Sequence, residues 1–307
     1  MSSPWICALR SVALEVPDLQ RALSFYTEVW HLDVAARTDE ALYLRGAGDD
    51  HHLLALHAGV GAPRIRHVTL RAHDRTALHA IARAAMREGG GILSPVAAIK
   101  DDPARGIGLT LCDSEGRVFQ IVCEDKLHAS HLDPTDRPVR LAHAVLNAAN
   151  LDTAQRFLEE VFGFVLSDRT RIMAFMNCNR DHHSLALGAA DNNALNHIAF
   201  LMPTLDAVMR GAGRMRDHGH TIEWGPGRHG PGNNVFGYFI DPFGIVIEYT
   251  AEVTQVDPGY AARGPADWAW PTGRLDQWGI GVGPTPRLKD AQKQVLFAPI
   301  HTNSYKL

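Results

Sequence analysis

The sequence predicts an α+β protein of two similar domains. Each domain is expected to contain two βαβββ modules whose strands form a curved, open mixed sheet around a pocket. Two observations predict this fold: the second half of the chain repeats the first at a nearly constant offset, and each half twice shows a strand, a helix and several strands. Internal repeats fix an architecture before any single element is assigned.

Four pairs of segments carry the repeat. Residues 9–25 align with 141–157, 50–56 with 181–187, 65–70 with 195–200, and 112–116 with 240–244. The offset falls only from 132 residues (Leu9 against Leu141) to 128 residues (Cys112 against Ile240). One such match could arise by chance, but four in the same order at almost one offset indicate a duplicated domain.

The second half shows the elements of one domain in order. Asn150 follows the first predicted strand and is a suitable N-cap for a helix. Asp241-Pro242-Phe243-Gly244, between the last two strands, has the composition of a tight turn. The predicted strands are 140–147, 164–167, 172–176, 183–187, 195–202, 220–224, 234–240 and 245–250, and the second helix is 204–218.

A polar segment with two prolines, from His131 to Pro138, marks the boundary between the domains. We therefore expect an N-terminal domain at residues 1–132 and a C-terminal domain at 133–253. The repeat ends there, and residues 254–307 form a tail with Trp268, Trp270 and Trp278 among glycines and prolines. We expect this tail to pack on the domains or on a neighbouring subunit of a homo-oligomer.

Composition narrows the class of protein. A net charge of −4 and a pI near 6.5 argue against a large basic surface for nucleic acid. No apolar run approaches the roughly 20 residues needed to span a bilayer, and the N-terminus lacks the pattern of a secretory signal. The four cysteines form no CxxC pair, so we expect free thiols. A soluble, cytoplasmic protein with no nucleic-acid or membrane partner is the expectation.

The positions at which the two repeats differ predict a metal site. His143 aligns with Ser11, His197 with His67, and Glu248 with Gln120. Two imidazoles and one carboxylate form the facial triad of non-haem Fe(II) oxygenases, which leaves three adjacent coordination positions open. One histidine on a strand is usually structural, and Glu248 alone could be a surface carboxylate. The three together predict a metal in the second domain and none in the first.

This order of ligands on paired βαβββ modules resembles the vicinal oxygen chelate superfamily, and within it the type I extradiol dioxygenases, which include catechol 2,3-dioxygenases. The resemblance covers residues 5–253 and is most specific in 225–249. There the family's histidine, tyrosine and metal glutamate match His229, Tyr238 and Glu248. A second family element, His-x-x-Ala-Leu, matches residues 183–187.

The resemblance implies extradiol cleavage of a catecholic or trihydroxylated aromatic by O2 at a mononuclear Fe(II) centre, with Mn(II) as the second choice. It implies an acid–base role for His183, and it implies that Tyr238 and His229 hydrogen-bond the bound catecholate and its oxygen. An imidazole suits acid–base chemistry because its ordinary pKa is about 6.5. His182 is the rival, since neighbouring residues of a strand point to opposite faces. The first half also has such a pair, His51-His52, so a structural role stays open.

Other functions remain possible from the residues. The fold would also suit another metalloenzyme, such as an isomerase, or a metal-free protein of the bleomycin-resistance kind that sequesters a ligand. Gly225-x-Gly227-x-x-Gly230 matches a dinucleotide fingerprint letter for letter. Pro231 and the glycines after it do not open a helix, so the context fails, and we expect a loop near the metal.

Overall fold

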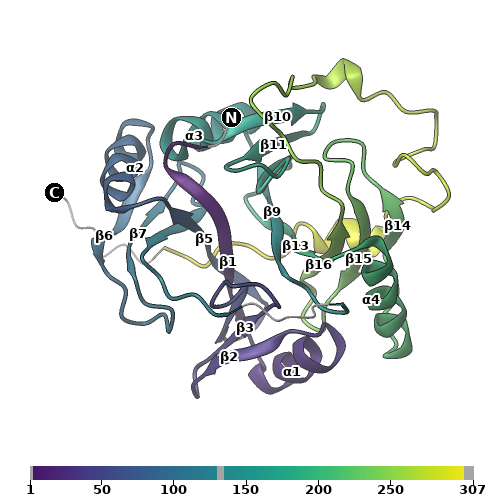
Figure 1. Ribbon diagram of the computed structural model, residues 1–307, viewed down its shortest axis with the longest axis horizontal. Coiled ribbons are helices and arrows are strands. Elements are labelled where there is room, and N and C mark those ends of the chain that lie inside the picture. The colour runs from purple at the N-terminus through teal and green to yellow at the C-terminus, as the bar shows by residue number, and fades with distance from the viewer. Residues whose placement is uncertain (1–2, 130–134, 301–307) are drawn as a thin grey trace.

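The computed structural model describes residues 3–129 and 135–300, and its first half forms one sheet of eight strands (Figure 1). Its strands are β1 (Ile6–Val16), β2 (Asp33–Arg37), β3 (Ala41–Arg45), β4 (Leu54–Ala58), β5 (Arg64–Ala72), β6 (Gly91–Ala98), β7 (Ile107–Cys112) and β8 (Val118–Cys123). Its helices are α1 (Leu19–Ser24), continued by the π-helical segment η1 (Phe25–Val29), and α2 (Arg75–Arg87).

The second half forms another eight-stranded sheet. Its elements are β9 (Arg140–Ala148), α3 (Leu151–Phe162), β10 (Val165–Arg169), β11 (Met173–Asn177), β12 (Leu185–Ala189), β13 (Leu195–Leu201), α4 (Leu205–Asp217), β14 (Trp224–Arg228), β15 (Val235–Ile240) and β16 (Val246–Ala251). The tail adds a short 3-10 helix, η2 (Pro265–Asp267), and α5 (Pro286–Ala291).

The two sheets have the same topology. The order is β2-β3-β4-β1-β5-β8-β7-β6 in the first and β10-β11-β12-β9-β13-β16-β15-β14 in the second. In each module the first strand pairs in parallel with the last, and the two modules of a sheet join through the antiparallel pairs β1–β5 and β9–β13. The predicted four βαβββ modules in two mixed sheets are therefore confirmed.

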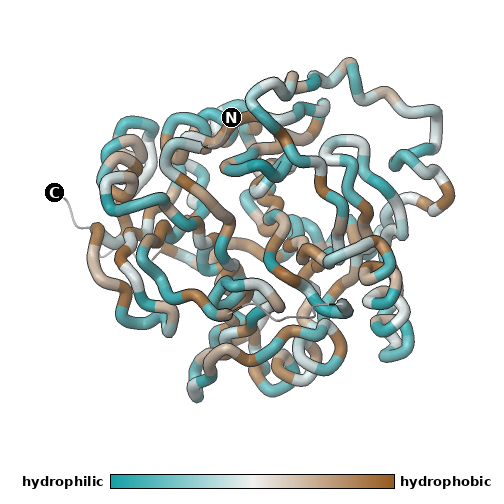
Figure 2. The backbone as a smooth tube through the Cα atoms, viewed as in Figure 1, coloured by the Kyte–Doolittle hydropathy of each residue, from teal (hydrophilic) through white to brown (hydrophobic). Residues whose placement is uncertain are grey.

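Each helix that follows the first strand of a module starts with a side-chain cap. Asn150 accepts a hydrogen bond from the backbone N–H of Thr153 at 3.0 Å, as the sequence predicted. Asp18, Asp74 and Thr204 cap their helices three residues ahead in the same way. Hydrophobic and hydrophilic residues alternate along these helices, as expected where one face packs on the protein (Figure 2).

Aromatic side chains join the two halves. The ring of Trp30, just after η1, stacks on Tyr249 of β16 with centroids 3.6 Å apart and lies edge-on to Phe200 of β13. In the other direction, Phe162 of α3 lies edge-on to Phe119 of β8 with centroids 5.1 Å apart. The first helix of each half thus packs on the second module of the other, so the two sheets share one apolar core.

The tail packs on both sheets of its own chain. Val295 bridges to Leu195 at the start of β13, and Phe297 bridges to Ile65 in β5. Contact with a neighbouring subunit stays a prediction, as do the domain limits. The limit at 132/133 and the last residues up to 307 lie outside the described residues. No helix in residues 3–129 or 135–300 is both long and apolar enough to cross a membrane.

One strand differs from its prediction by several residues. The strand expected at 220–224 is β14, which begins only at Trp224. The residues before Trp224 form the C-terminal turn of helix α4. Gly219 has a φ of +81°, and the N–H of His220 donates to the carbonyl of Met215. The prediction of a loop at 225–230 is therefore wrong in part. Residues 225–228 belong to this edge strand, and the turn begins only after Arg228.

Candidate metal centre

Three side chains predicted as ligands meet on adjacent strands of the second sheet. His143 lies on β9, His197 on β13 and Glu248 on β16, and the register sets Ala199 opposite both His143 and Glu248. His197 stands two residues before Ala199, so its side chain leaves the same face of the sheet. The pairing of the strands therefore brings together residues that are far apart in the chain.

The spacing of the three donor atoms fits one metal ion. Oε2 of Glu248 lies 3.1 Å from Nε2 of His143 and 3.2 Å from Nε2 of His197, and the two nitrogens are 3.3 Å apart. Adjacent ligands of a six-coordinate ion with bonds of roughly 2.1 Å would be about 3.0 Å apart. These three atoms thus form one triangular face, and the opposite face would stay free for other ligands.

The charge of Glu248 also fits a cation. Its side chain is 0% exposed, and in the described part of the chain its ion-pair partners are histidines. Burial would raise the pKa of this carboxyl group, but His143 and His197 outweigh burial and hold the pKa well below its usual value. Burial lowers the pKa of His197. Metal ligation requires ionised carboxylates and neutral imidazoles, and these two shifts favour that state for Glu248 and His197.

Two asparagines that sequence reasoning missed form hydrogen bonds with the predicted ligands. Oδ1 of Asn196 accepts a hydrogen bond from Nδ1 of His197 at 2.8 Å, which leaves Nε2 of this ring as the donor toward a metal. Asn234 is fully buried and its amide lies 3.5 Å from Oε1 of Glu248. The first half has Arg66 where the second has Asn196. This difference between the repeats is the signal in the sequence that points to Asn196.

Tyr238 and His229 lie beside the three predicted ligands. Tyr238 stands opposite Glu248 in the β15–β16 pair, and its hydroxyl is 3.5 Å from Nε2 of His197. Nε2 of His229 lies 3.1 Å from the same hydroxyl. Burial lowers the pKa of His229 to about 4, and burial together with Glu248 raises the pKa of Tyr238 well above its ordinary value. A neutral phenol and a neutral imidazole therefore face the centre.

His183 also faces the centre, whereas His182 is turned away. The ring of His183 lies 4.3 Å from that of His143, centroid to centroid, while Nε2 of His182 lies 2.8 Å from a carboxylate oxygen of Asp168. The expected reason was wrong, because the pair precedes β12 and strand alternation does not separate the two rings. Their hydrogen-bond partners do, and Asp168 is a third residue that sequence reasoning missed.

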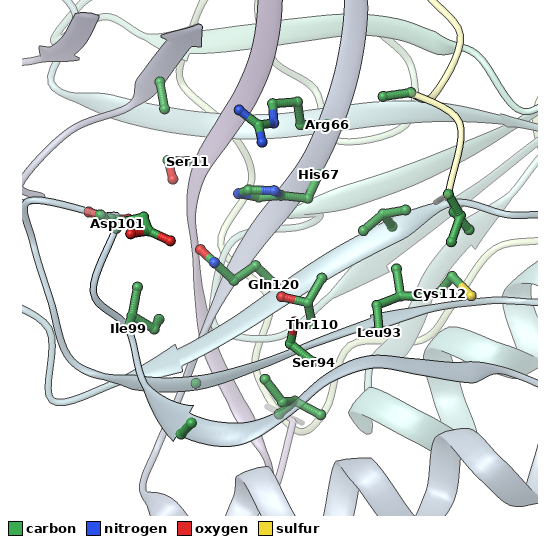
Figure 3. Close-up of a pocket in the computed structure, with 18 of the residues that line it drawn as sticks. Ser11, Arg66, His67, Leu93, Ser94, Ile99, Asp101, Thr110, Cys112 and Gln120 are labelled. Atoms are coloured by element: carbon green, nitrogen blue, oxygen red, sulfur yellow. The ribbon is translucent and has the colours of Figure 1, made fainter. Parts of the chain in front are cut away.

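The first sheet carries neutral groups at the three positions equivalent to the predicted ligands, which line a cavity of about 1360 Å³. Figure 3 shows Ser11, His67 and Gln120 pointing into one space. A hydroxyl and a neutral amide do not offset the charge of a divalent cation as Glu248 can. Burial lowers the pKa of His67 to about 3, so its ring is neutral as well. This cavity thus lies in the half that lacks the three predicted ligands.

Comparisons with known proteins agree with this fold. Residues 8–119 and 140–249 match the profile of the Glyoxalase/Bleomycin resistance protein/Dioxygenase superfamily. Metapyrocatechase 2 of Cupriavidus necator is 29% identical over 88% of both chains. The manganese-dependent 2,3-dihydroxybiphenyl 1,2-dioxygenase of Geobacillus genomosp. 3 is 23% identical over 75% of this chain and 80% of that one.

A solved structure is also similar along nearly the whole chain. The Mn(II)-bound glyoxalase from Novosphingobium aromaticivorans superimposes with a TM-score of 0.85, with 32% identity over 94% of both chains. The family profile spans both sheets and matches well over half of the residues. The chain therefore belongs to the Glyoxalase/Bleomycin resistance protein/Dioxygenase superfamily.

Proposed function

We propose that the protein is an extradiol dioxygenase that opens the ring of a catecholic or trihydroxylated aromatic with O2, using a divalent metal held by His143, His197 and Glu248. The triangular face of two imidazole nitrogens and one carboxylate oxygen, with separations of 3.1–3.3 Å, carries this proposal. Relatives whose names include metapyrocatechase and 2,3-dihydroxybiphenyl 1,2-dioxygenase support it.

Fe(II) is the metal that we propose, with Mn(II) as the second choice. Two imidazoles and a carboxylate with open positions suit non-haem Fe(II). A manganese-dependent relative and a Mn(II)-bound structural relative show that Mn(II) occurs in this family. When bound, a redox-active ion would orient both reactants and transfer electron density from the ring to oxygen.

The chain's own residues would bind and orient the substrate. The hydroxyl of Tyr238 and the imidazole of His229 lie within hydrogen-bond distance of each other, beside the ligands, and both can bond to the oxygens of a bound diol. His183 would accept a proton from a substrate hydroxyl, because burial and the neighbouring His143 lower its pKa and keep it neutral. Tyr238 and His183 are buried and the side chain of His229 is 20% exposed, so these groups lie largely out of contact with bulk water.

In this proposal the first domain, at residues 1–132, has no metal and the domain at 133–253 is catalytic. The homo-oligomeric state and the cytoplasmic location stay predictions from the sequence. An isomerase is the second candidate, since the Mn(II)-bound structural relative is named a glyoxalase. A metal-free binding protein is the third, but a buried carboxylate between two imidazoles argues against it.

One experiment separates these functions. The protein is loaded anaerobically with Fe(II), mixed with a panel of catechols and trihydroxybenzenes, and opened to oxygen, while O2 uptake and the yellow ring-opened product are recorded. The hemithioacetal of methylglyoxal and glutathione is tested in parallel. Oxygen uptake with the yellow product supports the proposal. Conversion of the hemithioacetal alone would support the isomerase, and protein that retains no metal would support the binding protein.

A further inference from the structure

A chain of hydrogen bonds connects the tail to the predicted acid–base residue. Asp168 on β10 is 0% exposed, and its carboxylate accepts four hydrogen bonds. The donors are Nε2 of His182 at 2.8 Å, the hydroxyl of Tyr260 at 3.1 Å, and the backbone N–H and guanidinium of Arg263 at 2.9 and 3.1 Å. Nδ1 of His182 in turn lies 3.0 Å from Nδ1 of His183.

The direction of each hydrogen bond follows from the groups involved. An ionised carboxylate only accepts, so Nε2 of His182 carries the proton that it donates to Asp168. If this is the only ring proton of His182, its lone pair is on Nδ1, and the contact between the two Nδ1 atoms then has His183 as the donor. A His183 ring whose single proton is on Nδ1 has its lone pair on Nε2, and no hydrogen bond to this nitrogen occurs among residues 3–129 and 135–300.

The first half provides an internal comparison. Asp168 stands opposite Phe175 in the β10–β11 pair, and the equivalent residue opposite Tyr43 in the β2–β3 pair is Ala36. His51 and His52 form the same pair there, with their Nδ1 atoms 3.1 Å apart.

The partner of the second ring differs between the halves. Nε2 of His52 lies 2.9 Å from Nη1 of Arg10, which can only donate. The nitrogen that is open on His183 is thus engaged on His52. The first half has Ala36 at the place of Asp168, and the carboxylate near its histidine pair, that of Asp102, lies 3.7 Å from Nε2 of His52 instead.

From this geometry we propose that Asp168 is a positioning residue for the ring-cleavage reaction. With Tyr260 and Arg263 it holds His182, and through His182 it fixes His183 with a protonated Nδ1 and with the lone pair of Nε2 toward the metal centre. The inference rests on the proposed function for its catalytic consequence. It also assigns a task to this part of the tail, which supplies two of the three residues that donate to Asp168.

The surroundings of Asp168 support this role. Burial would raise the pKa of its carboxyl group, but the hydrogen bonds from His182 and Arg263 outweigh burial and lower the pKa, so the group is ionised. A buried carboxylate needs such compensation to persist in a core. The guanidinium of Arg263 also lies 4.1 Å from the ring of Trp268, and its carbonyl accepts from the N–H of Arg169. Both the guanidinium and the backbone of Arg263 are thereby held in place.

The first test reads the proton positions without any turnover. Protein labelled with ¹⁵N-histidine is loaded with diamagnetic Zn(II), and long-range ¹H–¹⁵N correlations show which ring nitrogen of each histidine carries the proton. The signals of His183 are assigned by their loss in His183→Gln. We expect Nδ1–H for His183 and Nε2–H for His182. A wild-type spectrum with Nε2–H on His183 would overturn the proposal, and this measurement needs no variant of Asp168.

The second test removes the carboxylate. In Asp168→Asn we expect this proton pattern to be lost, metal content to stay near that of the wild type, and kcat with the best catechol to fall about 10- to 100-fold with little change in KM. Tyr260→Phe leaves the carboxylate of Asp168 in place, so it should keep the proton pattern, and kcat should fall only a few-fold. Asp152→Asn is the matched control. Asp152 is exposed and forms an ion pair with Arg169, the residue that follows Asp168 on β10.

The outcomes separate the two proposals. An Asp168→Asn protein that keeps the wild-type proton pattern, or that loses its metal, contradicts the positioning role. If wild-type protein shows the expected pattern but opens no catechol, the proposed function fails while the hydrogen-bond assignment stands. If Asp168→Asn does not fold, the wild-type spectrum and Tyr260→Phe still decide the question.

Discussion

Nε2 of His143 and Oε2 of Glu248 lie 3.1 Å apart in the interior, although 105 residues separate them in the chain. The adjacent strands β9, β13 and β16 bring them together, and the same strand order in the first sheet brings Ser11 and Gln120 to the equivalent places. One topology thus serves both halves, and under the proposed function these two differences determine which half holds the divalent metal.

The histidine that faces the centre should matter more than its neighbour. We expect His183→Gln to keep its metal and to lose about 10²- to 10⁴-fold in turnover, the usual effect of removing an acid–base group. His182→Gln should lose less, because it acts through His183. Steady-state kinetics with metal analysis of both variants check this. A larger loss in His182→Gln than in His183→Gln would show that the roles are reversed.

The hydroxyl of Tyr238 should assist turnover without holding the metal. Tyr238→Phe removes a hydrogen-bond donor beside His197 and His229 and keeps the aromatic ring, so metal content should stay near that of the wild type. We expect kcat/KM to fall by about 10-fold, as for the loss of one hydrogen bond worth ~1.5 kcal/mol. Thr110→Ala is the control, since Thr110 stands opposite Gln120 as Tyr238 stands opposite Glu248. Equal losses in both variants would contradict the assignment.

Acid should destabilise the metal-free protein over a defined range. Burial lowers the folded-state pKa of His67 to about 3 and that of His51 and His57 to about 4. Between these values and the unfolded pKa of about 6.5, the unfolded chain binds more protons, so stability is lost as the pH falls from about 6.5.

Urea titrations in EDTA at pH 7.5 and pH 5.0 measure this effect. The urea midpoint should drop at the lower pH, and the drop should be smaller in His67→Gln. An unchanged midpoint at pH 5.0, or the same drop in wild type and variant, would contradict the neutral state of these three rings.

The contact between Trp30 and Tyr249 should stabilise both halves together. Trp30 is 0% exposed and its ring touches three aromatic side chains of the second sheet, so Trp30→Ala would leave a cavity between the halves. We expect a loss of about 3–5 kcal/mol in the free energy of unfolding, measured by urea denaturation. Val60→Ala, at a fully exposed position, is the control and should change little. A loss below 1 kcal/mol would show that the halves do not depend on this contact.

The sequence predicted the features that repeat. The order of strands and helices and the cap at Asn150 follow from local patterns that occur in both halves, and aligning the halves exposed the difference between Ser11 and His143. Asp168 was missed because its partner His182 precedes a strand and its other partners lie in the aperiodic tail. The predicted start of β14 was wrong because the residues after α4 form the C-terminal turn of that helix, and local hydrophobicity does not reveal such a turn.

The metal content of two matched variants tests the central claim most directly. His197 and His67 occupy equivalent positions, but only His197 lies beside a second imidazole and a carboxylate. Both alanine variants are made under iron-replete, anaerobic conditions, checked for folding by circular dichroism and analysed for bound iron. We expect about one iron per chain in wild type and His67→Ala, and almost none in His197→Ala, because a lone imidazole binds a divalent ion far more weakly than a preorganised triad. A folded His67→Ala that has lost its iron, or a folded His197→Ala that retains it, would contradict the account.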